Sequence, residues 1–556
     1  MLLATWISLT LPQVLRLAVD DLYRGVTAEK LGRYALMYIG IALLGAVFRF
    51  HMRRHVIGVS RAIEFDLRND LFAHLQRLPA EYYHAHRTGE IMSRATNDLA
   101  AVRMMVGPGV LYLFNTVAVA TASIAFMLRI SPRLTLYTLI PLPFVSFSVW
   151  FFGERIHHRF EAIQSHFATI AARVQENLSG VRVVRAFAIE DREMADFRVL
   201  NEEYRRRNLD LISNSGLFHP GLGFLSGLAA LLALYLGGRE VITGKISLGQ
   251  FVAFTAYLGT LNWPVVALGW VVSLWQRGLA SFARIDEILA TRPTVRTRPG
   301  ARRIDRPRGA IEFRHLTYHY PGSDRPVLRD VSLAIEPGST VAFVGRTGAG
   351  KSTLLHLLPR VFDPPPGTVF LDGHDVLDLE LHSLRAAIVA VPQDTFLFSD
   401  TLAANISYGT DGAGADEIER AGTIANLHPD VARFPDGWQT RVGERGITLS
   451  GGQRQRTAIA RALMRGGTVL MLDDCLSSVD THTEEAILKG LRTEMRRRTS
   501  LIVSHRVSTV CDADLIVVLE DGAMVERGTH AELLAHGGRY AGLQRLQQLE
   551  EELEAS

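Results

Sequence analysis

The first half of the chain alternates between long apolar runs and polar stretches. Six runs are nearly free of charged residues: Met1–Val19, Tyr34–Phe48, Val110–Leu128, Leu134–Phe152, Leu217–Leu236 and Leu248–Leu274. Most of them approach or exceed the roughly 20 residues that a helix needs to cross a bilayer. Six buried core helices of a large soluble protein are the alternative, and the spacing of the connectors argues against it. The pattern therefore predicts an all-α transmembrane domain with six spans.

The distribution of basic residues predicts the orientation of these spans. Lys and Arg are few in the three short connectors, with 3, 2 and 2 in Asp20–Arg33, Arg129–Arg133 and Gly237–Ser247. The two long polar stretches hold 8 and 10 arginines, in His51–Gly109 and Glu154–Gly216. Because positive residues stay on the cytoplasmic side, the long stretches are expected inside and both termini with them. We expect a multi-pass protein of the cell membrane.

The two long inner stretches have helical character. Residues 62–72 carry apolar side chains at three- and four-residue steps, which predicts helices that project far into the cytoplasm. Each stretch returns through a polar break, near Pro79–Gly89 and near Ala186–Phe197. Such breaks would suit contact with a soluble domain beneath the membrane, and a solvated helical hairpin is the alternative.

The first apolar run begins at Met1 without a preceding basic segment. A secretory signal needs a charged start and a small-residue cleavage site, and a full span normally carries a flanking basic anchor. We therefore expect that the natural start is earlier and that part of the first helix precedes Met1.

Composition narrows the class of protein further. The chain has 556 residues, too many for one domain, and its formal charge of +3 is too small to indicate nucleic acid as a partner. Only two cysteines occur, Cys475 and Cys511, so no disulfide framework is implied and a reducing compartment is expected. No Asp or Glu lies inside an expected span, which favours nucleotide over ion coupling as the energy source. Three tryptophans near the last span line a ligand cavity or serve as packing anchors: Trp263, Trp270 and Trp275.

The boundary between the two halves is rich in Arg and Pro and has no apolar period. We expect a transmembrane domain over residues 1–295, a linker over 296–309, a nucleotide-binding domain over 310–545 and a tail over 546–556. The segment Leu543–Glu554 is expected as a charged helix that either braces a dimer or is solvated.

A glycine-rich loop follows a short apolar strand at Ser339–Val344 and precedes a helical run at Leu354–Leu358. Strand, G-x-x-x-x-G-K-S loop and helix form the context of a phosphate-binding P-loop, in which backbone N–H groups and the helix N-terminus surround the phosphates. Lys351 would neutralise the β- and γ-phosphates and Ser352 would ligate Mg²⁺. The expected contacts to nucleoside triphosphate are Gly345, Arg346, Thr347, Gly348, Ala349, Gly350, Lys351, Ser352 and Thr353.

Further motifs follow in a fixed order along the second half: Tyr320, Val391–Gln393, Thr440–Gly446, Leu449–Arg456, Val469–Asp474, Ser477–Asp480 and Ser504–Arg506. This series resembles the nucleotide-binding domain of ABC transporters. With six spans ahead of it, the whole chain resembles a half-transporter of the multidrug-exporter type. The expected fold is multi-domain, a six-helix type I/IV ABC exporter domain followed by an α/β P-loop ATPase domain.

The resemblance assigns roles around the P-loop. Tyr320 would stack on the adenine of ATP, and Asp473, at the end of an apolar strand, would hold Mg²⁺. Gln393 would reach the metal and the attacking water, and His505 would contact the γ-phosphate.

The resemblance also implies a partner. A helix opens at Ser450, Gly451, Gly452 and Gln453, so it presents N–H groups to an anion. In this family that anion is the γ-phosphate of ATP on the other subunit, so two half-transporters must pair.

One residue departs from the family pattern. The general base is a Glu directly after the metal-binding Asp, and this chain has Asp474. The side chain is one methylene shorter, which withdraws the carboxylate by roughly 1 Å and can cost about 100-fold in rate. We expect ATP binding with slow hydrolysis at this site, in a heterodimer whose partner carries the Glu. A homodimer with two slow sites is the alternative.

The expected function is ATP-driven export of hydrophobic or amphipathic compounds, including drugs, lipids or peptides. A regulatory ATP-binding membrane subunit and a homodimeric lipid or drug flippase are the alternatives. An importer is disfavoured, because importers usually carry the ATPase on a separate chain.

Overall fold

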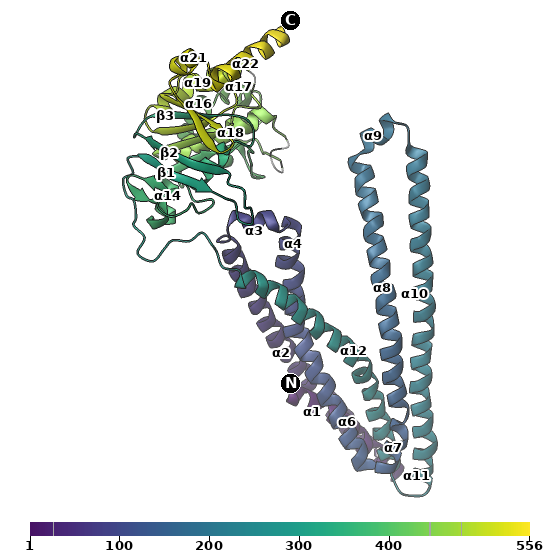
Figure 1. Cartoon of the computed structure of the whole chain (residues 1–556). Helices are drawn as coiled ribbons and strands as arrows, with labels where there is room; N and C mark the ends of the chain where they lie inside the picture. Colours follow the sequence, from purple (N-terminus) through teal and green to yellow (C-terminus); the bar gives the residue numbers. More distant parts are fainter. Residues whose placement is uncertain (26, 444–445, 447, 480, 556) are drawn as a thin grey trace. The chain divides into compact units, whose positions relative to one another are not determined.

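The computed structural model describes residues 1–25, 27–443, 446, 448–479 and 481–555 (Figure 1). It divides the chain into two compact units. The first consists of Met1–Gln76 and His86–Thr291, and the second of Arg77–Ala85 and Arg292–Ser556.

The first unit is entirely helical. Its α-helices are α1 (Leu2–Tyr23), α2 (Ala28–Leu75), α4 (Thr88–Ser93), α5 (Leu99–Met104), α6 (Val110–Ile130), α7 (Pro132–Leu139), α8 (Pro141–Ser179), α9 (Val181–Ala186), α10 (Glu190–Leu232), α11 (Gly238–Ile242) and α12 (Leu248–Ala290). Three π-helical turns interrupt them, η1 (Arg94–Asp98), η2 (Met105–Gly109) and η3 (Ala233–Gly237). Within this unit α8 and α10 run side by side as a hairpin joined by α9 (Figure 1).

Among the described residues, four helical segments are long and apolar enough to cross a membrane: Ala28–Leu75, Thr88–Ile130, Pro132–Ser179 and Glu190–Ile242. The other two expected spans fall on α1 and α12, and a shorter apolar helix is recognised at Leu248–Leu261. The membrane domain is therefore helical and multi-pass, as the sequence predicts.

The long helices exceed the thickness of a bilayer. At 1.5 Å per residue the 48 residues of α2 span about 72 Å, against about 30 Å for a hydrocarbon core. The first polar break contains α3 (Ala80–Ala85). The second break lies earlier than predicted, between Gly180 and Ile189, since α10 already begins at Glu190. Three acidic residues in the first turn of α10 favour a start at that point, because they complement its positive end.

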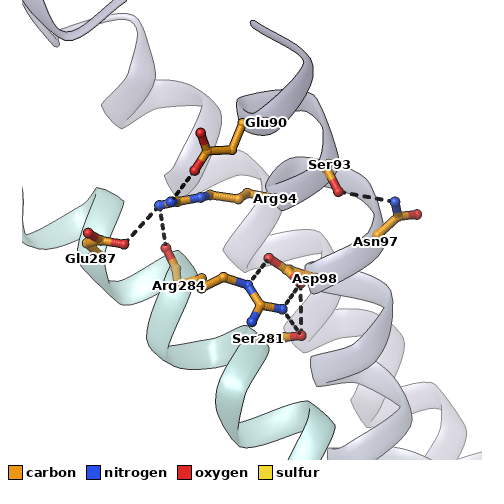
Figure 2. Close-up of polar contacts among 8 residues, drawn as sticks. All are labelled: Glu90, Ser93, Arg94, Asn97, Asp98, Ser281, Arg284 and Glu287. Atoms are coloured by element: carbon orange, nitrogen blue, oxygen red, sulfur yellow. Dashed lines mark hydrogen bonds and ion pairs between the residues drawn. The ribbon is translucent and has the colours of Figure 1, made fainter. Parts of the chain in front are cut away.

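Two ion-pair groups join α12 to the helices after α3 (Figure 2). Asp98, at the end of η1, is buried and accepts hydrogen bonds from Arg284 Nε at 2.9 Å and Nη2 at 2.5 Å. The Ser281 hydroxyl adds a third, at 2.9 Å. One turn away Arg94 pairs with Glu287 at 3.1 Å and with Glu90 at 2.5 Å. These contacts fix η1 against α12 by charge as well as by packing.

The second unit contains two sheets. The four-stranded sheet has the order β2-β1-β4-β5 and the six-stranded sheet the order β10-β9-β3-β8-β7-β6. The strands are β1 (Ile311–Tyr318), β2 (Leu328–Ile335), β3 (Thr340–Val344), β4 (Val369–Leu371), β5 (His374–Asp375), β6 (Ile388–Val391), β7 (Val469–Asp473), β8 (Thr499–Val503), β9 (Leu515–Glu520) and β10 (Ala523–Gly528). All neighbouring pairs from β9 to β6 are parallel, and β10 is antiparallel at the edge.

Helices and short turns surround these sheets. They are α13 (Lys351–Leu357), η4 (Val376–Asp378), α14 (Leu381–Ala387), α15 (Leu402–Ile406), α16 (Ala415–Ile424), α17 (His428–Val431), η5 (Gly437–Gln439), α18 (Gly451–Arg465), α19 (Thr481–Met495), α20 (Val507–Val510), α21 (His530–His536) and α22 (Arg539–Ala555). β3, β7 and β8 are buried over their whole length, so they read as continuous apolar runs rather than alternating ones. The two hydrophobic clusters of the unit draw on alternate residues of these strands.

Two peripheral segments pack on this α/β unit. The linker runs beside η4, with Arg302 N–H donating to the Asp378 carbonyl at 2.8 Å and Glu380 N–H to the Arg302 carbonyl at 2.8 Å. Helix α3 belongs to the same unit: Leu78 and Tyr82 are buried, and Ala80 packs against the cluster that contains β1. The first cytoplasmic break therefore contacts the soluble domain, as expected.

Candidate functional site

The parallel sheet gathers the expected site residues at one edge. The P-loop follows β3, Gln393 follows β6, Asp474 follows β7 and His505 follows β8. Because the carboxyl ends of parallel strands meet at the same edge, residues scattered over about 160 positions face one region. The sequence motifs alone give no such proximity; it results from the strand order.

The P-loop closes tightly around the end of β3. Gly345 has φ +146° and a Cβ there would lie 2.2 Å from the Leu519 carbonyl oxygen. Gly350 has φ +95°, ends the loop in the left-handed region, and stands directly before the first residue of α13. Side chains at these two positions would push the loop off the neighbouring strand, so glycine is required at both.

Lys351 holds the inside of this loop. Its ammonium donates to the carbonyl oxygens of Gly345 at 2.7 Å and Arg346 at 2.9 Å. Burial lowers the pKa of Lys351, and the nearby carboxylates of Asp474 and Asp473 counteract part of that shift. The same positive charge stands at the N-terminus of α13, where phosphate oxygens are favoured.

Ser352 and Asp473 form a pair of oxygen donors beside the lysine. The Ser352 hydroxyl donates to Asp473 Oδ1 at 3.0 Å. Asp473 is buried, and desolvation raises its pKa although the Ser352 hydrogen bond opposes the shift. A hydroxyl and a buried carboxylate fit Mg²⁺, which prefers hard oxygen ligands and would offset the cost of burying the carboxylate charge. These are the metal ligands named from the sequence, together with Gln393.

Gln393 and Asp474 face each other across the strand ends. The Gln393 amide donates to Asp474 Oδ2 at 3.4 Å. Asp474 has φ +44°, in a region that Asp tolerates better than most residues, and its N–H donates to the Val503 carbonyl at 2.8 Å. The turn after β7 therefore places this carboxylate next to the P-loop lysine rather than along the strand.

Tyr320 contacts the first turn of α13. Its hydroxyl shares a 2.9 Å hydrogen bond with Thr353 Oγ1, and its ring packs edge-on against Phe362 with centroids 5.2 Å apart. The ring is thus held beside the start of α13, in a position to stack on a nucleobase.

One cavity of about 390 Å³ collects these groups. Its walls include twelve of the expected residues: Tyr320, Thr347, Gly348, Ala349, Gly350, Lys351, Ser352, Thr353, Gln393, Asp473, Asp474 and His505. The expected contacts Gly345 and Arg346 line a neighbouring pocket instead. Val327 and Val503 also line it and escaped the sequence analysis. Val503 ends β8 directly before Ser504 and His505. Its position next to that motif is the sequence signal that could have placed Val503 in the site. Val327, before β2, carries no such signal.

Within the described part of the chain, the four residues that open α18, called the signature residues below, are not found in this cavity. Among the described residues, the wall of this cavity contains none of Ser450, Gly451, Gly452 and Gln453. They open α18, where Ser450 Oγ accepts from Gln453 N–H at 3.2 Å and Gln453 Oε1 accepts from Ser450 N–H at 2.9 Å. This reciprocal capping box fixes the helix start and leaves Ser450 exposed. The expected motif residues Glu444, Arg445 and Asp480 lie outside the described residues.

Two family models match the chain. The model for the ABC transporter transmembrane region matches residues 1–265, and the model for the ABC transporter matches residues 328–477. Over 549 residues the chain is 38% identical to the multidrug resistance-like ATP-binding protein MdlA of Escherichia coli, with 98% of this chain and 92% of that protein covered. The chain belongs to the ABC transporter family.

A second relative and a solved structure specify the type of ABC transporter. The probable multidrug resistance ABC transporter ATP-binding/permease protein YheI of Bacillus subtilis is 38% identical, with 97% of this chain and 92% of that protein covered. A bacterial Atm1-family ABC exporter solved with ATP bound has a TM-score of 0.80 at 32% identity, covering 98% of this chain and 96% of that one. This ABC transporter is an exporter half-transporter, with its membrane and ATP-binding domains on one chain.

Proposed function

We propose that this ABC exporter pairs with a second, different half-transporter, holds Mg²⁺–ATP at its own P-loop, and hydrolyses it slowly. The observation that carries the proposal is Asp474 in the position directly after β7, on the wall of the nucleotide cavity. Its shorter side chain, already hydrogen-bonded to Gln393, is poorly placed to hold an attacking water in line with the γ-phosphorus.

The binding machinery of the same site supports ATP retention. Lys351 provides the charge for the β- and γ-phosphates, and Ser352 and Asp473 would hold Mg²⁺. Tyr320 would stack on the adenine and His505 would contact the γ-phosphate. Bound Mg²⁺ would neutralise phosphate charge. The ATP-binding side chains of this site keep their roles whether the residue after Asp473 is Asp or the longer Glu.

The signature helix supports pairing. Ser450, Gly451 and Gly452 open α18 and are not among the described residues that line this chain's own cavity, which suits an ATP bound to another subunit. This chain would complete the partner's site with its signature, while a Glu on the partner would act as general base there. A homodimer with two slow sites is the second candidate.

We propose that two ATP molecules between the paired ATP-binding domains favour the closed pair. Helix α3, which packs on the ATP-binding domain, would transmit closure to the spans and open the cavity outward. Hydrolysis at the partner's site would remove the γ-phosphate contacts and reset the inward-facing state. The exported compounds would be hydrophobic or amphipathic, in keeping with relatives named for multidrug resistance.

Exchange of one residue tests the catalytic part of this proposal. Asp474→Glu should raise ATP turnover of the purified chain by up to about 100-fold, because it returns the missing methylene. Asp474→Asn is the control, since it keeps the length of Asp but removes the base. Equal turnover for the wild type and Asp474→Glu, in both the chain and its complex, contradicts a slow site caused by geometry.

A transport assay tests the proposed pairing and the proposed export of hydrophobic compounds. The native complex is purified through a tag on this chain, its second subunit is identified, and both are placed in inside-out vesicles. ATP-dependent uptake of hydrophobic dyes or lipid probes is expected. Recovery of this chain alone, with full transport, supports the homodimer; a complex that binds ATP but moves none of the probes supports a regulatory subunit.

A further inference from the structure

We propose that Gln547, on the C-terminal helix α22, is a positioning residue for His505 in the ATP site. The Gln547 side-chain amide donates to the main-chain carbonyl of His505. Its carbonyl oxygen accepts from Val507 N–H at 2.7 Å. One side chain therefore holds the backbone on both sides of Arg506, in the short segment that carries His505 into the nucleotide cavity.

The chemistry of this contact suits an amide. The two main-chain groups are one acceptor and one donor, so only a side chain with both functions can satisfy them together. Arg506, which precedes α20, supplies no side-chain cap to that helix. Gln547 Oε1 provides the missing acceptor from a different helix.

The first turn of the C-terminal helix α22 is held in place by hydrogen bonds and burial. Glu526 accepts from the N–H groups of Arg539 at 2.5 Å and Tyr540 at 3.1 Å, which caps the first turn of α22. Tyr540 is fully buried and its hydroxyl pairs with His530 Nδ1 at 2.7 Å. Gln547 lies seven residues after Tyr540, so both are on one face of the helix, about 10 Å apart along its axis.

Contacts to Glu484 and Val479 also hold this segment. Arg506 forms an ion pair with Glu484, which is buried, and donates to the Val479 carbonyl at 3.2 Å. Thr509 donates its hydroxyl to the same carboxylate at 2.5 Å. The Arg506 N–H also donates to Ser504 Oγ at 3.0 Å, across His505. The Gln547 amide adds the side-chain hydrogen bond to the His505 carbonyl itself. The charged tail expected from the sequence therefore reaches the catalytic edge of the sheet.

The inference rests on the proposed role of His505 at the γ-phosphate. If Gln547 acts through His505, its loss should weaken ATP more than ADP, because ADP lacks the phosphate that His505 would contact. We expect Gln547→Ala to lower the ratio of ATP to ADP affinity by about three- to tenfold, the range for one or two lost hydrogen bonds.

Two further variants separate positioning from helix capping. Gln547→Glu keeps an oxygen for Val507 N–H but replaces the donor to the His505 carbonyl with a repelling oxygen. It should therefore preserve the slow hydrogen exchange of the Val507 amide and still lower the ATP-to-ADP ratio. Gln548→Ala removes an exposed glutamine from the same helix and is the matched control, with neither effect expected.

The experiment measures Mg²⁺–ATP and Mg²⁺–ADP binding, and hydrogen exchange of the peptide containing Val507, on the full chain in lipid nanodiscs. His505→Ala should lower the affinity ratio, and adding Gln547→Ala to it should lower the ratio no further. If His505→Ala lowers the ratio while both Gln547 variants behave like Gln548→Ala, the positioning role is overturned and the proposed ATP site stands. If His505→Ala itself leaves the ratio unchanged, the proposed role of His505 is wrong and the inference falls with it.

Discussion

The Ser352 hydroxyl donates a 3.0 Å hydrogen bond to Asp473 Oδ1, joining the first turn of α13 to the end of β7. The P-loop helix and the strand that ends in the carboxylate are therefore in direct contact. Burial makes the charged form of Asp473 costly, and a divalent cation would relieve that cost.

Asp473→Asn should stabilise the nucleotide-free chain and weaken Mg²⁺-dependent ATP binding by about 10- to 100-fold, as for lost metal-site contacts. The amide carries no charge to desolvate, but it is a poor Mg²⁺ ligand. Thermal unfolding with and without Mg²⁺–ATP measures both effects. A variant that binds Mg²⁺–ATP like the wild type would exclude Asp473 from the metal site.

The raised pKa of Asp473 predicts how the stability difference between Asp473→Asn and the wild type depends on pH. The folded state keeps the proton to a higher pH than the unfolded chain does, so this group's contribution to stability falls as pH rises from its ordinary pKa through the raised one. The melting-temperature gap between Asp473→Asn and the wild type should widen over that window and then become constant. Comparing the two proteins cancels the other titrating groups, and a gap independent of pH contradicts the prediction.

Tyr320 should contribute to ATP affinity through its ring rather than its hydroxyl. Tyr320→Ala removes the surface expected to stack on adenine and should weaken ATP binding by about 5- to 100-fold, the range for a base–aromatic stack. Tyr320→Phe loses the 2.9 Å contact with Thr353 but keeps the ring, so it should bind nearly like the wild type. Equilibrium binding of a fluorescent ATP analogue distinguishes them, and equal weakening of both variants would assign the effect to the hydroxyl.

Arg284→Ala should destabilise the membrane unit. Asp98 is buried, and the substitution leaves its carboxylate with the Ser281 hydroxyl in place of the two guanidinium hydrogen bonds, at a cost of about 1–3 kcal/mol. Arg205→Ala is the control, because Arg205 and Glu202 form an exposed pair with 65% and 62% of their side chains accessible. Melting temperatures in lipid nanodiscs should fall for the first and stay within error for the second. Equal shifts would mean that the Asp98 contact is no stronger than a surface pair.

Ser450→Ala should act on the partner's site and not on this chain's own. The substitution removes the N-cap of α18, worth about 1 kcal/mol, and an expected contact to the partner's ATP. ATP affinity of the isolated chain should stay unchanged, while turnover of the native complex falls. Weaker ATP binding by the isolated chain would place the signature in its own site instead.

Patterns formed by neighbouring residues in the sequence predicted most of the fold. Apolar length predicted membrane helices, and strand–loop–helix order with Gly345, Gly350 and Lys351 predicted the P-loop, because both depend on neighbouring residues. The apolar period of residues 62–72 predicted a helix, and these residues lie within α2. The second break was placed several residues too late, since Gly180 and the acidic start of α10 set it rather than the polarity of the stretch.

Sequence patterns were enough to establish that membrane helices are followed by an ABC-type ATP-binding domain on one chain, because apolar length and contiguous motifs are local properties. The tertiary structure alone decided which distant groups meet. It placed Gln393 against Asp474, Asp98 against Arg284, and Gln547 of the expected tail against the backbone of His505. The physical reason is that strand order and helix packing bring these pairs together across 42 to 186 positions of sequence, and no periodicity or local motif reports a contact over that separation.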